Sequence, residues 1–126
     1  MRAVDTNVLV RLMTRDDVKQ VAVAETFVAN GAWVPHLAIA EATWVLSSVY
    51  DREPNAVAAA VEMLLSHEHL TVQDPEVVAA AVAQFRQYPK VGFSDCLMVE
   101  VARKAGHIPL GTFGRDLGKI DGAQRL

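Results

Sequence analysis

Four acidic residues stand at positions where their carboxylates can meet in the folded chain. Asp5 follows the first short apolar run, and Asp116 shortly follows the last one. Glu41 and Asp95 fall in the first turns of two expected helices. In a parallel α/β sheet these places converge at the carboxyl edge of the strands, where ligands bind. Four carboxylates there would raise one another's pKa unless a cation supplied counter-charge, and oxygen ligands select Mg²⁺ or Mn²⁺, as one or two ions.

Each acid also has an ordinary structural explanation. Asp5 alone suits a turn or a helix cap, Asp95 suits a helix N-terminus, and Asp116 suits a solvated surface. Glu41 is the hardest to explain in this way, because its helical spacing from Leu37 and Trp44 places it in an apolar stripe. A carboxylate there costs stability unless it has a partner. Taken together, the four acids favour a metal site.

The elements that must position these acids are short strands alternating with helices. We expect strands at Ala3–Val4, Ala32–Val34, Leu70–Val72 and Ile108–Thr112. We expect helices over residues 8–12, 16–30, 37–50, 54–67, 75–88 and 94–106, and a last short helix or strand near the C-terminus. This alternation predicts an α/β domain with a parallel sheet.

Length and composition indicate one globular domain over residues 1–126. The apolar share is 52% and the charged share 21%, which is ordinary for a globular chain. The net charge of −3 argues against holding nucleic acid by bulk positive charge, but it leaves a nuclease with an acidic metal site open. The single cysteine, Cys96, has no partner for a disulfide and is expected to be a buried packing thiol in a cytoplasmic protein. We expect no membrane segment and no export signal.

Other residue types that could carry chemistry give weaker signals. All four histidines are expected to be structural or surface residues, since no pair has metal-ligand spacing. Trp33 and Trp44 are expected in the core rather than as platforms for stacked bases. No glycine-rich loop for binding phosphate is present.

Four motifs, in order along the chain, resemble the PIN-domain family, and specifically the VapC-type toxins of bacterial toxin–antitoxin pairs. The motifs are Asp5-Thr6-Asn7, Ala40–Leu46, Phe93–Leu97 and Leu110–Leu117. The resemblance implies a three-layer α/β/α sandwich with a short-stranded parallel sheet. It also implies a Mg²⁺- or Mn²⁺-dependent endoribonuclease of a type II pair. A homodimer and a small cognate antitoxin that occludes the groove are implied as partners, with RNA as substrate.

Residue by residue, the resemblance assigns the metal and catalytic roles to the four acids already named: Asp5, Glu41, Asp95 and Asp116. Many relatives place an Asp at the position that Gly114 occupies here, so Asp116 is expected to take the fourth role. The small polar neighbours expected to hold the carboxylates in place are Thr6, Asn7 and Ser94. The residues expected to position the RNA backbone are Arg11, Arg15 and Arg115.

Two alternatives from other classes stay open. One is a catalytically weakened PIN-like binding module, for which Gly114 is the suspect feature. The other is a phospho-accepting receiver domain, which shares the length and the acidic pocket. A receiver needs paired acids after its first strand, whereas Asp5 stands alone, and Asp74 is better explained as a helix cap.

Overall fold

A computed structural model describes all of residues 1–126 and contains two small parallel sheets. The first sheet has the order β1-β2-β3, with β1 at Arg2–Ala3, β2 at Ala32–Val34 and β3 at Leu70–Val72. Its register places Ala3 beside Trp33 and Trp33 beside Thr71. The second sheet pairs β4, at Leu110–Thr112, with β5, at Ala123–Arg125.

Six α-helices connect and cover the strands. They are α1 (Thr6–Thr14), α2 (Val18–Val28), α3 (His36–Ser48), α4 (Pro54–Ser66), α5 (Pro75–Gln87) and α6 (Phe93–Ala105). Two short 3₁₀ helices complete the chain, η1 at Pro89–Val91 and η2 at Leu117–Lys119. The expected α/β class is confirmed, and the arrangement is consistent with a PIN-like α/β/α fold. None of the helices combines the length and apolar character needed to cross a membrane.

The helix starts follow local chemistry that the sequence already contains. Asp5 and Asp17 are the N-cap residues of α1 and α2, where their side chains accept hydrogen bonds from backbone N–H groups three residues later. Pro54 and Pro75 occupy the first turns of α4 and α5, where the missing N–H costs nothing. The helix expected from residue 94 begins one residue earlier, at Phe93, and its N-cap is Gly92.

The core lies among the helices and against one face of the first sheet. Its largest fully buried side chains come from several helices and from the segment after η2, among them Leu9, Ile39, Leu64, Val78 and Ile120. In β2 and β3 the outer residues are buried and the central residues, Trp33 and Thr71, are exposed. Because successive side chains point to opposite faces of a sheet, one face is covered and the other is open.

Both tryptophans lie outside the core, so that expectation is wrong. Trp33 is 37% exposed on the open face of the sheet, and Trp44 is 62% exposed on α3. The reason for Trp44 is the orientation of α3, which turns Ala38, Ile39 and Leu46 toward the interior.

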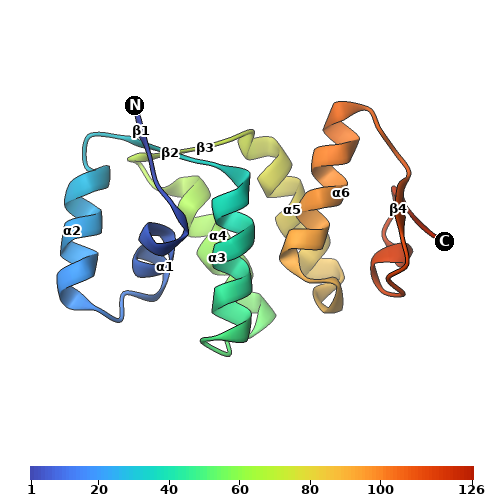
Figure 1. Cartoon of the computed structure of the whole chain (residues 1–126), viewed down its shortest axis with the longest axis horizontal. Helices are drawn as coiled ribbons and strands as arrows, with labels where there is room; N and C mark the ends of the chain where they lie inside the picture. Colours follow the sequence, from blue (N-terminus) through green and yellow to red (C-terminus); the bar gives the residue numbers. More distant parts are fainter.

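The second sheet lies apart from the first. Figure 1 shows β4 at the opposite end of the long axis from β1. Ile120, which is 1% exposed, joins this terminal segment to the core. Arg103 on α6 also donates a hydrogen bond of 2.6 Å to the carbonyl of Asp121. We call β4, η2 and β5 together, residues 110–125, the terminal unit.

Candidate active site

Two of the four predicted acids line one cavity at the carboxyl ends of β1 and β2. The cavity has a volume of about 580 Å³, and its polar lining consists of Asp5, Thr6, Asn7 and Glu41. We call it the acidic cavity. Asp5 and Thr6 are placed there by the end of β1 and the start of α1, and Glu41 by the second turn of α3. The structure thus brings Asp5 and Glu41 together from adjoining elements at this edge.

Asp5 combines a capping role with a free carboxylate oxygen. Its Oδ1 accepts a hydrogen bond of 3.1 Å from the backbone N–H of Val8. The N-terminus of a helix carries partial positive charge, which stabilises the ionised carboxylate. Asp5 is exposed, so its second oxygen remains available to a ligand in the cavity.

Glu41 is held by a neighbour across the cavity. The Thr6 hydroxyl donates a hydrogen bond of 3.2 Å to Glu41 Oε2, which links α1 to α3. The expectation that Glu41 interrupts a buried apolar stripe is wrong, because Glu41 is exposed. Leu37 and Trp44 on the same face are 69% and 62% exposed. The stripe is apolar, but it faces solvent beside the site.

Ser94 and Asp95 lie at the start of α6, next to the acidic cavity. Ser94 shares a second, smaller pocket of about 380 Å³ with Glu41 and Trp44. Asp95 follows in the first turn of α6 and is only partly exposed. Burial raises the pKa of the Asp95 carboxyl above its ordinary value, because the charged form loses solvation.

This raised pKa makes a prediction for Asp95→Asn in metal-free buffer containing EDTA. A carboxyl whose pKa is higher in the folded than in the unfolded protein destabilises the fold once it ionises. The stability of the wild-type protein therefore falls as pH rises from below the ordinary value of 3.8 through the raised pKa. Asparagine does not titrate, so the variant should gain in unfolding temperature over the wild type between about pH 3 and pH 7. An unfolding-temperature difference that is independent of pH would contradict this assignment.

Asp116 is not brought to the other three acids. It lies at the start of η2 in the terminal unit, and its nearest cation is Lys119 Nζ at 3.8 Å. No group of three or more His, Cys, Asp or Glu side chains lies close enough together to hold a metal ion. The fourth strand precedes Asp116 as expected, but this strand belongs to the second sheet.

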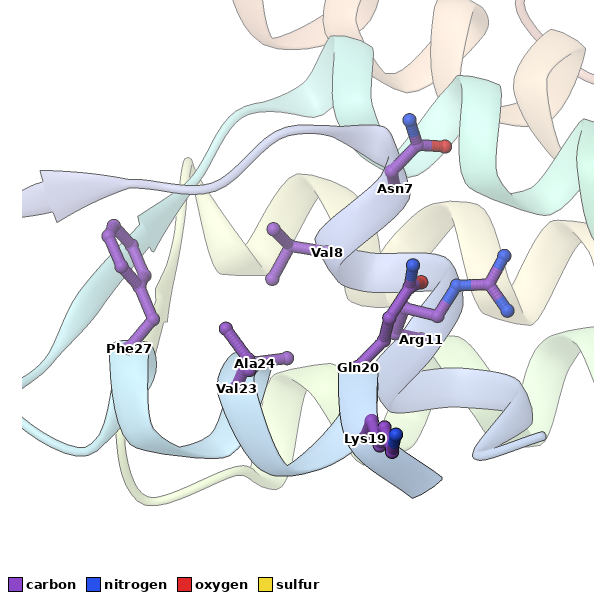
Figure 2. Close-up of a pocket in the computed structure, with 8 residues that line it drawn as sticks. All are labelled: Asn7, Val8, Arg11, Lys19, Gln20, Val23, Ala24 and Phe27. Atoms are coloured by element: carbon purple, nitrogen blue, oxygen red, sulfur yellow. The ribbon is translucent and has the colours of Figure 1, made fainter. Parts of the chain in front are cut away.

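A largely apolar groove between α1 and α2 adjoins the acidic cavity. Figure 2 shows Val8 on α1 facing Ala24 on α2, with Phe27 at one end and Arg11 at the other. The groove has a volume of about 360 Å³. Asn7 lines both the groove and the acidic cavity, so the two are neighbours. We call this the α1–α2 groove.

The sequence analysis did not anticipate this groove. The available signal was the pair Val23 and Phe27, spaced four residues apart on α2. They lie beside the buried positions Val21, Ala24 and Val28. Val23 remains 71% exposed, so the apolar face of α2 is wider than the core requires.

The three arginines proposed to position RNA have different surroundings. Arg11 lies in the groove, bonded to Asp16 at 2.7 Å, and its hydrogen bond to Tyr50 raises the pKa of the guanidinium. Arg15 pairs with Glu25 at 2.7 Å. Arg115 is exposed in the terminal unit and does not line the acidic cavity. Arg11 is therefore the one of the three that lies beside the candidate site.

Cys96 is buried among the core residues, as expected for a packing thiol. Burial and the neighbouring carboxylates of Asp95 and Glu100 raise the pKa of this thiol to about 12. The thiolate is the reactive form, so Cys96 is chemically inert at neutral pH.

Residues 2–123 match the family model of the PIN domain. The chain belongs to the PIN domain family. No curated protein and no solved structure matches it. PIN domains are generally metal-dependent nucleases, and the match spans both sides of the acidic cavity and most of the terminal unit.

The donors in the acidic cavity of this PIN domain suit a divalent cation. Asp5 and Glu41 offer carboxylate oxygens, and Asn7 and Thr6 offer further oxygens close by. Mg²⁺ is commonly held by one or two carboxylates, with water and substrate phosphate completing its shell. The acidic cavity therefore fits a hard cation, without a thiol or imidazole ligand that would select a softer metal.

Proposed function

We propose that this PIN domain is a Mg²⁺- or Mn²⁺-dependent endoribonuclease that acts as the toxin of a type II toxin–antitoxin pair in the cytoplasm. The observation that carries the proposal is the acidic cavity, where Asp5 and Glu41 share one open space at the strand ends. Asp95 lies near it on α6, and Asp116 is the fourth acid of the proposed site.

In the mechanism, Asp5 and Glu41 would hold the cation. When bound, the cation supplies positive charge to the scissile phosphate and increases the acidity of a water molecule. The chain's own groups fix the carboxylates: the Val8 N–H orients Asp5, and the Thr6 hydroxyl orients Glu41. Groups that orient ligands in this way typically change metal affinity or activity by about 10- to 100-fold when removed.

The RNA backbone would reach the acidic cavity along the α1–α2 groove. Arg11 lies in this groove and offers a guanidinium for phosphate. The same groove is our candidate for the antitoxin contact, because the apolar surface of Val23 and Phe27 suits an apolar segment of a small protein. An antitoxin seated there would cover Asn7 and block the route to the acidic cavity.

The proposal predicts cleavage of a labelled total-RNA pool by the purified protein, free of antitoxin, in Mg²⁺ or Mn²⁺ and not in EDTA. Fragments with defined ends would show endonucleolytic cutting and begin to identify the target. Equal cutting with and without EDTA would contradict the metal-dependent mechanism. Adding Ca²⁺ in place of Mg²⁺ is a matched control, because Ca²⁺ prefers more ligands at longer distances.

A second candidate function is a PIN-like binding module without turnover. The observation that favours it is that no three acids converge, and that Gly114 stands where relatives carry an acid. This module would bind Mn²⁺ and its protein partner and leave the RNA pool intact. Calorimetric Mn²⁺ titration beside the cleavage assay distinguishes the two functions.

A further inference from the structure

Four strands of this chain have an edge with no neighbouring strand. They are β1 and β3 in the first sheet and β4 and β5 in the second, and the edges of β1 and β4 are considered first. Val4 N–H donates to the Trp33 carbonyl at 3.1 Å, and Leu110 N–H donates to the Gly122 carbonyl at 2.8 Å. Backbone groups of successive residues in a strand point to opposite sides. Those of Ala3 and Gly111 therefore point to the open edges.

The three residues of β4 include no charged side chain and no proline, the features that usually prevent strands from pairing, and Pro109 stands just before the strand begins. The strand is flanked by two exposed apolar side chains, Ile108 at 40% and Phe113 at 81%. Natural edges are commonly protected by charged side chains or bulges. The β5 edge has such protection, since Arg125 is exposed there. Of the two edges in the second sheet, β4 is the one open to a partner.

We propose that β4 of one copy pairs in parallel with β1 of a second copy, which places Asp116 of the first copy at the acidic cavity of the second. The combined sheet has the order β3-β2-β1-β4-β5, with the last two strands from the other copy. A two-fold axis forms the same contact twice, so the assembly closes as a dimer with two sites.

The register follows from the strand ends. With Ala3 level with Thr112 of the second copy, its N–H faces the carbonyl of Gly111, and its carbonyl faces the N–H of Phe113. Asp5 is two residues past Ala3 and so lies level with Gly114 of the second copy. Asp116 then follows one short turn later, at the carboxyl edge where the acidic cavity opens.

A second copy is the occupant that the geometry of one chain favours. Within the chain, β1 and β4 lie at opposite ends of the long axis (Figure 1). The terminal unit is held there by buried Ile120 and by the hydrogen bond from Arg103 to Asp121. Pairing within one chain would break both contacts, whereas pairing between copies keeps them.

The pairing is tested without any assay of activity, through the double variant Ala3→Cys/Thr112→Cys. Neighbouring parallel strands place facing Cα atoms about 4.8 Å apart, within the range that a disulfide spans. Mild oxidation should give a disulfide-linked dimer on non-reducing gels. Buried Cys96 should not interfere, because it is inert in the wild-type protein. The matched control is Ala3→Cys/Gln124→Cys, which moves the second thiol to β5 and should not cross-link.

Two results would overturn the pairing. One is a disulfide formed within a single chain, which would mean that β4 joins β1 of the same copy. The other is the absence of a disulfide together with a wild-type protein that elutes as a monomer in light-scattering chromatography. Neither readout depends on catalysis, so a failure of the pairing is distinguishable from a failure of the proposed function.

The shared site, which rests on the proposed function, is tested by mixing two inactive variants, Asp5→Asn and Asp116→Asn. In a dimer made of either variant alone, both sites carry a substitution. A mixed dimer has one site carrying both changes and one site with all its acids intact. Random exchange should restore about one quarter of the wild-type cleavage rate, since half of the dimers are mixed and each has one intact site. If the mixture stays inactive although the cysteine dimer forms, Asp116 does not act across the interface.

Discussion

Asp5→Asn is expected to lower metal-dependent RNA cleavage by at least about 100-fold while leaving the unfolding temperature nearly unchanged. The loss follows because an amide cannot supply the negative charge that holds a divalent cation in the acidic cavity. Stability is kept because asparagine caps a helix about as well as aspartate. The Val8 N–H, now 3.1 Å from Asp5 Oδ1, finds an equivalent acceptor in the amide oxygen. Cleavage rate and thermal unfolding are measured on the same preparation.

Asp17→Asn provides the matched control. Asp17 caps α2 as Asp5 caps α1, and its Oδ1 accepts from the Gln20 N–H at 3.0 Å. It does not line the acidic cavity. The same chemical change should therefore leave cleavage and Mn²⁺ affinity at wild-type levels. If both variants lose activity to the same extent, the loss does not come from the acidic cavity, and the assignment of Asp5 to the cation is wrong.

The sequence predicted the fold well because its signals are local. Acidic N-caps, prolines in first turns and glycines after helices fix where elements begin and end, and these signals need no knowledge of distant contacts. The parallel sheet followed from the alternation of strands and helices. The sequence pattern did not predict the division into two sheets. The strands β4 and β5 are each three residues long, and packing rather than local sequence decides which strands lie beside them.

The placement of the site residues shows the same limit. Asp5 and Glu41 could be placed together because Asp5 lies just past β1 and Glu41 lies in an early turn of the helix that follows β2, and both strands belong to the same sheet. Asp116 also follows a strand, but that strand is in the terminal unit. Periodicity placed Trp44 and Leu37 on one face of α3 correctly. It could not tell whether that face meets the core or solvent, because apolar side chains are common on both.

Ile120→Ala is expected to lower the free energy of unfolding by about 2–5 kcal/mol, the usual cost of truncating a fully buried isoleucine. Ile120 is 1% exposed and is the buried contact between the terminal unit and the core. Removing its side chain leaves a cavity at the junction that holds β4 in place. Urea unfolding at fixed protein concentration measures the change, because a dimer's apparent stability depends on concentration.

Ile108→Ala is the matched control for this last prediction, since it makes the same substitution just before β4 at a side chain that is 40% exposed. Its effect should stay within about 0.5 kcal/mol. A large loss in the free energy of unfolding for Ile120→Ala alone would mean that the terminal unit unfolds together with the helices. The position of Asp116 relative to the helices would then be fixed. Equal, small losses would mean that the unit is only loosely joined, and β4 would then be free to move toward β1 of its own chain. The contribution of the buried Ile120 side chain to the free energy of unfolding therefore bears on which copy supplies Asp116.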